Sequence, residues 1–170
     1  VIADDHEVVR QGVRGVLDGE DGFQVVGEAQ DGDAAIALVA DVQPDVLVLD
    51  VNMPGKSGLD VTRELRAAGV SVRILILSMH DEPEYVLQAV RSGADGYVLK
   101  DVSPAELRDA VQAVYEGREY FTAQVSQQLS VGLREEIEEQ QLRTRLDSLT
   151  PRETEVLLLI AEGHTNREAG

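Results

Sequence analysis

The sequence predicts an α/β fold in which a doubly wound parallel sheet is covered by helices on both faces. Short β-rich runs alternate with amphipathic segments of helical period from residue 1 to residue 117, and this alternation is typical of strands joined by crossover helices. The runs Val46–Leu49 and Ile74–Leu77 are continuously apolar, which indicates strands buried on both faces. The sheet is therefore expected to form the core.

Five strands and five helices account for the alternation. The predicted strands are Val1–Ala3, Phe23–Ala29, Val46–Asp50, Ile74–Ser78 and Gly96–Leu99. The predicted helices, with apolar residues three and four positions apart, are Glu7–Leu17, Asp33–Val42, Gly58–Ala68, Glu82–Ser92 and Pro104–Glu116. Two helix starts have capping residues ahead of a proline, namely Asp81 before Pro83 and Ser103 before Pro104.

After Gly117 the sequence becomes rich in glutamine and charged residues, and residues 122–147 are predicted to be a partly helical linker. Its acidic stretch, Glu135–Glu139, forms either a solvated helix face or part of a seam for helix pairing. The apolar residues of that alternative seam are Leu133, Ile137 and Leu142.

Residues 148–170 predict the start of a second, helical domain. Capping motifs begin at Thr150 and Thr165, and Gly163 between them is a typical helix terminator. Two short helices meeting at a tight turn are therefore expected.

Composition limits the class of protein. The 170 residues are enough for one well-filled domain and a smaller one. No apolar run approaches the roughly 20 residues that span a bilayer, and no secretory leader precedes the first strand, so a cytoplasmic protein is expected. The net charge of −17 restricts any contact with nucleic acid to a local surface, and the absence of cysteine excludes thiolate metal sites.

Polar residues follow the predicted strands at the edge where ligands bind in such sheets. They are Asp4, Asp5, Asp50, Ser78 and Lys100. Carboxylates about 4 Å apart repel by roughly 4 kcal/mol at an effective dielectric near 20, so the acidic residues predict a bound cation. Oxygen ligands favour Mg²⁺ over zinc. A carboxylate beside Mg²⁺ and Lys100 can attack a phosphoryl group, which would form an acyl phosphate on Asp50.

These residues, together with Asp50–Gly55 and Tyr97–Lys100, resemble the motifs of bacterial receiver domains from Val1 to about Phe121. The resemblance implies a flavodoxin-like sheet with strand order 2-1-3-4-5 and a receiver domain at residues 1–121. It also implies that Asp50 is the phospho-acceptor and that Asp5 and Asp50 bind Mg²⁺.

The resemblance implies roles for the remaining residues of the site. The backbone carbonyl of Asn52 would complete the Mg²⁺ ligands, and Asp4 would act through water. Lys100 would contact the phosphoryl group. Ser78 would then move to the new phosphate, and Tyr97 would swing from exposed to buried.

Two neighbours of the site receive a further implied role. By the same resemblance, Asn52 and His80 would tune the lifetime of the phosphoryl group. His6, His80 and His164 are otherwise interpreted as ordinary polar residues, and no metal is assigned to histidine.

Motifs in residues 148–170 resemble the opening of the DNA-binding domain of LuxR-type and NarL/FixJ-type regulators. The recognition helix would follow Gly170, so the residues that read DNA are unknown. The resemblance implies a non-enzymatic two-component regulator whose partners are a sensor histidine kinase, DNA and, when phosphorylated, a second copy. The dimer would use Val8–Leu17 and Leu107–Val114.

Two other classes remain as alternatives. A phosphatase with an aspartate nucleophile needs an acid two residues beyond it, and Asn52 cannot provide one. A nucleotide-binding Rossmann protein lacks its glycine-rich motif here. A receiver that signals only through protein contacts is the remaining alternative if the second resemblance misleads.

Overall fold

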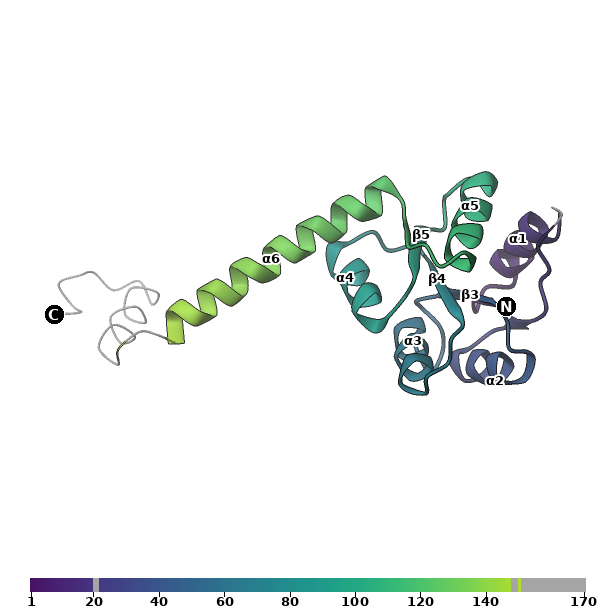
Figure 1. The fold of residues 1–170 in the computed structure, drawn as a ribbon, viewed down its shortest axis with the longest axis horizontal. Coiled ribbons are helices and arrows are strands. Elements are labelled where there is room, and N and C mark those ends of the chain that lie inside the picture. Colours follow the sequence, from purple (N-terminus) through teal and green to yellow (C-terminus); the bar gives the residue numbers. More distant parts are fainter. Residues whose placement is uncertain (20–21, 148–149, 151–170) are drawn as a thin grey trace. The chain divides into compact units, whose positions relative to one another are not determined.

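The computed structural model describes residues 1–19, 22–147 and 150 of the chain. Its centre is a parallel sheet of six strands in the order β2-β1-β3-β4-β5-β6, flanked by helices (Figure 1). The strands are β1 (Ile2–Ala3), β2 (Glu28–Ala29), β3 (Val46–Asp50), β4 (Arg73–Ser78), β5 (Gly96–Leu99) and β6 (Tyr120–Phe121). The predicted fold class and the order of the first five strands are confirmed.

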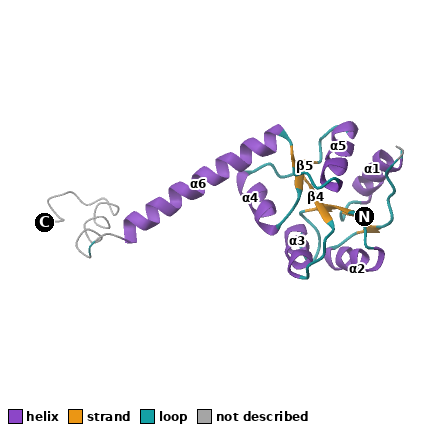
Figure 2. Cartoon of the chain, in the orientation of Figure 1, coloured by secondary structure: helices purple, strands orange, loops and turns teal. Residues whose placement is uncertain are grey.

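Helices cover both faces of this sheet (Figure 2). They are α1 (Glu7–Asp18), α2 (Gly32–Val42), α3 (Gly58–Ala67), α4 (Pro83–Ser92) and α5 (Pro104–Tyr115). Helices α1 and α5 pack together on one face, around Val48, Leu75 and Val98. Helices α2, α3 and α4 pack on the other face, around Leu49 and Ile76. The continuous apolar runs predicted from the sequence are thus buried on both sides.

The sixth strand is a difference from the prediction of five. Tyr120 and Phe121 extend the sheet by pairing in parallel with Gly96 and Tyr97 of β5. A strand of two residues is too short for an alternating pattern to reveal it.

The second strand is much shorter than the predicted Phe23–Ala29. Only Glu28 and Ala29 pair with β1, opposite Ile2 and Ala3. The paired part of β1 is itself two residues long, and this limits the ladder that β2 can form.

The predicted cap of α4 is also wrong. The N-cap is Glu82, which makes no side-chain capping bond. Asp81 instead accepts a hydrogen bond from Gln124 Nε2 at 2.9 Å. The prediction for α5 is confirmed, because Ser103 caps that helix and Pro104 lies in its first turn.

The segment predicted to be partly helical forms one continuous helix, α6 (Ala123–Asp147). Its beginning packs on the sheet domain, where Val125 is buried and Leu129 contacts the core. The chain forms two compact units, Val1–Val131 and Gly132–Gly170. No helix in the described part of the chain is long and apolar enough to cross a membrane.

Candidate functional site

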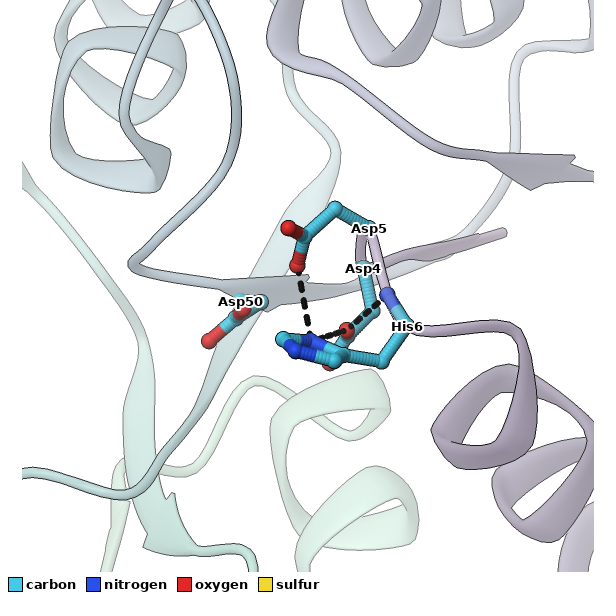
Figure 3. Close-up of side chains that lie close together, drawn as sticks. All are labelled: Asp4, Asp5, His6 and Asp50. Atoms are coloured by element: carbon cyan, nitrogen blue, oxygen red, sulfur yellow. Dashed lines mark hydrogen bonds and ion pairs between the residues drawn. The ribbon is translucent and has the colours of Figure 1, made fainter.

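Acidic side chains converge at the carboxyl ends of β1 and β3 (Figure 3). Asp4 directly follows β1 and Asp50 is the last residue of β3, and both are almost completely buried. Asp5 and His6 continue the chain beyond Asp4 and are exposed. One ligand atom from each of these four residues lies within 4.8 Å of the others. We call these four residues the acidic cluster.

Lys100, just after β5, supplies positive charge to the acidic cluster. Its Nζ lies 2.6 Å from Asp4 Oδ2 and 3.1 Å from Asp50 Oδ2. Apart from these ion pairs, both oxygens are buried without a hydrogen bond among the described residues. One lysine therefore faces two buried carboxylates, and these three side chains keep a net negative charge.

Burial and the neighbouring charges shift the pKa values of Asp50 and Lys100. Burial, reinforced by the charge of Asp4, raises the pKa of Asp50 although Lys100 opposes the change. Burial alone would lower the pKa of Lys100, but its contacts with Asp4 and Asp50 outweigh this effect and raise the pKa. Lys100 is therefore held as a cation beside the two buried carboxylates.

The backbone beneath Asp50 is fixed by the start of α3. The Gly58 N–H donates to the Val51 carbonyl at 2.8 Å. A Cβ atom at Gly58 would lie only 2.1 Å from the Asp50 carbonyl oxygen, so only glycine fits. Ser57 and Asp60 form a reciprocal capping box that holds this end of α3 in place.

Arg10 of α1 holds the turn that carries the acidic pair. Its Nη1 donates to the Asp4 carbonyl at 2.7 Å, and its Nε donates to Glu28 of β2 at 3.1 Å. Arg14 also pairs with Glu28, and this contact is the main reason that the pKa of Glu28 is lowered. Sequence reasoning missed Arg10, because its partners lie on other elements.

On the other side of the site, Ser78 ends β4 and is completely buried. Its hydroxyl oxygen accepts the His80 backbone N–H at 3.1 Å. The Tyr97 hydroxyl donates to the His80 carbonyl at 2.6 Å. Tyr97 is buried in this structure, and burial raises the pKa of its hydroxyl to about 12.

The two residues expected to tune the site lie in contact with each other. Asn52 Nδ2 is 2.6 Å from His80 Nε2. The His80 ring also stacks on Tyr85 of α4, with ring centroids 4.2 Å apart. His80 thus connects the loop after β3 to α4.

His6, which the sequence suggested to be an ordinary polar residue, lies beside the carboxylates of the acidic cluster. His6 Nδ1 lies 3.1 Å from Asp4 Oδ1 and 2.8 Å from Asp5 Oδ1 (Figure 3). The direct sequence Asp4-Asp5-His6 was the signal that could have indicated this. His164 lies outside the described residues, as do the predicted features of residues 151–170.

The acidic cluster has the chemistry of a Mg²⁺ site. Asp4, Asp5 and Asp50 provide carboxylate oxygens, which Mg²⁺ prefers. The excess negative charge and the buried oxygens of Asp4 and Asp50 are reasons for a cation to bind there. The residues present therefore fit the ion that the sequence predicted.

Comparison with known proteins identifies the family. The model of the response regulator receiver domain matches residues 1–112. The chain belongs to the response regulators of two-component systems. This response regulator is 37% identical to the transcriptional regulatory protein DegU of Brevibacillus brevis, over the whole chain and 77% of the relative. It is 40% identical to the nitrate/nitrite response regulator protein NarP of Escherichia coli K12, over 99% of the chain and 76% of the relative.

A solved structure agrees with these relatives. The two-component response regulator of the LuxR family from Aurantimonas sp. SI85-9A1 superimposes with a TM-score of 0.72 at 37% identity. The match covers 76% of this chain and 92% of that one. The predicted resemblance to receiver domains and to NarL/FixJ-type regulators of the LuxR family is confirmed.

Proposed function

We propose that this response regulator accepts a phosphoryl group on Asp50 from a sensor histidine kinase, with Mg²⁺ as cofactor. The observation that carries the proposal is the buried Asp50 carboxylate, placed beside Lys100 and the other carboxylates at the strand ends. Few functions require this arrangement, because its uncompensated charge is costly without a ligand.

The reaction is a phosphoryl transfer between two side chains. A carboxylate oxygen of Asp50 attacks the phosphorus of a phosphohistidine, the P–N bond breaks, and its electron pair stays on the imidazole of the kinase. Lys100 stabilises the negative charge on the equatorial oxygens in the transition state. Mg²⁺, when bound by the carboxylates of the site, would add positive charge beside the transferred group.

Four residues would hold the metal ion. Asp5 and Asp50 would bind Mg²⁺ through their carboxylates, Asn52 would bind through its backbone carbonyl, and Asp4 would act through water. The contact between Arg10 and the Asp4 carbonyl supports this assignment, because it fixes the turn between β1 and α1.

The signal would leave the site through Ser78. The Ser78 hydroxyl oxygen now accepts a hydrogen bond from the His80 N–H. This bond would break when Ser78 moves to donate to a new phosphate oxygen. The His80 carbonyl is tied to Tyr97, so Ser78 and Tyr97 are coupled through one residue. Asp81, the next residue, binds Gln124 in the first turn of α6, which offers a route toward the C-terminal region.

The output is proposed to be dimerisation that pairs two DNA-binding domains. On the face made by α1 and α5, Val8 is 82% exposed and Tyr115 is 56% exposed. Much of Leu107–Val114 is buried in the core of the monomer, so its exposed positions would contribute to the dimer. DNA would be bound by the complete C-terminal domain.

The structure offers no support for the alternative of a phosphatase with rapid turnover. Asn52 lies two residues beyond Asp50, and its amide contacts His80. An amide cannot protonate a leaving group. We therefore propose a regulator that dephosphorylates itself slowly at most.

The test is to incubate the chain with Mg²⁺ and acetyl phosphate and to measure its intact mass. The wild type is expected to gain one phosphoryl group and Asp50→Asn none. Asp41→Asn, which alters an exposed aspartate of α2, serves as the matched control and should be phosphorylated normally. Equal phosphorylation of Asp50→Asn, or none of the wild type with either acetyl phosphate or the kinase, would contradict the proposal.

A further inference from the structure

We propose that His6 is an additional metal ligand and that the acidic cluster therefore takes a transition-metal ion, such as Co²⁺ or Ni²⁺, more tightly than Mg²⁺. This inference rests on the proposed metal site at Asp5 and Asp50 and adds one ligand to it. It concerns the choice of metal, which the carboxylates alone do not determine.

The position of the imidazole is the first argument. Figure 3 shows the His6 ring turned toward the carboxylates of Asp4 and Asp5, with Nδ1 within about hydrogen-bond distance of both, at 3.1 and 2.8 Å. The His6 backbone N–H also donates to Asp4 Oδ1 at 2.8 Å. The side chain is thus attached to the cluster at two points.

Distances within the cluster are the second argument. Metal–nitrogen and metal–oxygen bonds are about 2.0 to 2.2 Å, so two ligand atoms of one ion lie at most about 4.4 Å apart. The ligand atoms of Asp4, Asp5, His6 and Asp50 all lie within 4.8 Å of one another. The His6 side chain is 64% exposed, so packing does not prevent the small rotation that binding requires.

Buried oxygens with few partners are the third argument. Asp4 and Asp50 are 2% and 3% exposed, and among the described residues their buried Oδ2 atoms have Lys100 Nζ as their partner and no other. Lys100 compensates only part of the negative charge. These carboxylates point to a cation independently of His6.

The combination of ligands then selects the class of metal. Carboxylate and carbonyl oxygens suit Mg²⁺, whereas imidazole nitrogen favours later first-row ions such as Co²⁺ and Ni²⁺. Binding through Nδ1 would leave Nε2 directed away from the ion, free to bond to water. The site would still place positive charge beside Asp50, as the phosphoryl transfer requires.

The test is calorimetric titration of the wild-type chain, His6→Ala and Asp50→Asn with Mg²⁺ and, separately, with Co²⁺. In the wild type, Co²⁺ should bind more tightly than Mg²⁺. His6→Ala should weaken Co²⁺ binding by about tenfold, the lower end of the losses typical of metal-site variants, and should leave Mg²⁺ binding within about twofold. Visible absorption of bound Co²⁺ should also change when the imidazole is removed.

Other results would overturn either the role of His6 or the metal site itself. Unchanged Co²⁺ affinity in His6→Ala, equal losses for both ions, or tighter binding of Mg²⁺ by the wild type would overturn the role of His6. Asp50→Asn should weaken both ions, and if it weakens neither, the shared metal site of the proposed function fails instead. Circular dichroism and urea unfolding of each variant identify any loss of fold.

Discussion

The two ends of the central strands carry charged residues in contrasting arrangements. At the amino ends, Asp95 lies between two arginines, 2.7 Å from Arg66 Nη2 and 3.1 Å from Arg73 Nη1. It also accepts the Ile74 backbone N–H at 2.7 Å. At the carboxyl ends, the two buried carboxylates of Asp4 and Asp50 share Lys100, and Asp5 lies in the same cluster. At the amino ends the single carboxylate is satisfied by both arginines and a backbone N–H, whereas at the carboxyl ends the carboxylates outnumber their one lysine.

This contrast separates stability from function within one sheet. Arg66 further donates to the carbonyls of Gly93, Val70 and Val72, so the amino ends are connected by several directed bonds. Functional sites commonly retain unfavourable electrostatics that the remainder of the fold must offset. The paired end provides part of this compensation.

The largest expected effect is the loss of the paired cluster. Asp95→Ala should lower the free energy of unfolding by about 3 kcal/mol, because it leaves the Ile74 N–H without its acceptor and removes the carboxylate that separates two arginines. Urea unfolding measures the change. Asp41→Ala, an exposed aspartate of α2, is the control and should change stability by less than about 0.5 kcal/mol. Similar losses in both variants would remove the contrast between the two ends.

At the opposite end, removal of a charge should stabilise the protein. Without Mg²⁺ and at neutral pH, Asp50→Asn should raise the free energy of unfolding by about 2 kcal/mol, because a neutral amide relieves repulsion while its oxygen still contacts Lys100. Addition of Mg²⁺ should stabilise the wild type more than the variant. A less stable Asp50→Asn without metal would show that Lys100 already balances the site.

The advantage of Asp50→Asn should also depend on pH. Because burial raises the pKa of Asp50 above 3.8, the folded state takes up a proton more readily than the unfolded state, and the penalty of the ionised group disappears as pH falls. The difference in stability between the two proteins should therefore be largest at neutral pH. As the pH falls below the raised pKa of Asp50, this difference should become smaller, and it should approach zero below about pH 3.8. If urea titrations gave the same difference in stability at every pH in this range, the raised pKa of Asp50 would be contradicted.

The smallest expected effect concerns a neutral bond at the functional end. Tyr97→Phe removes the hydroxyl that donates to the His80 carbonyl and should lower the free energy of unfolding by about 1 kcal/mol. Tyr115→Phe, at an exposed position, is the matched control and should have almost no effect in the same measurement. A loss for Tyr97→Phe as large as that for Asp95→Ala would mean that one neutral bond at the carboxyl ends stabilises the fold as much as the charged cluster at the amino ends.

Local sequence patterns were sufficient for most of the fold. Parallel strands all run in one direction, so their carboxyl ends lie at the same edge of the sheet. The residues that follow each apolar run were therefore expected to meet at that edge. Asp4, Asp50, Ser78 and Lys100 were found in this way, and the structure brings Asp4, Asp50 and Lys100 into direct contact.

The features that were missed depend on contacts between distant segments. The cap at Asp81 was predicted from neighbouring residues, but its carboxylate binds Gln124, 43 positions further along the chain. Arg10 acts through Glu28 on another element. His6 was set aside because histidines were sought in pairs, whereas its partners are carboxylates. Contacts of this kind produce no regular spacing of residue types along the sequence.

The close approach of Gly58 to the Asp50 carbonyl has a consequence for mutational tolerance. Every other residue type would introduce a carbon where the carbonyl oxygen lies, so the whole loop after β3 would have to shift. In a library of single substitutions, position 58 should tolerate as few replacements as position 50. A residue with only a hydrogen as its side chain would thus rank among the most constrained in the protein.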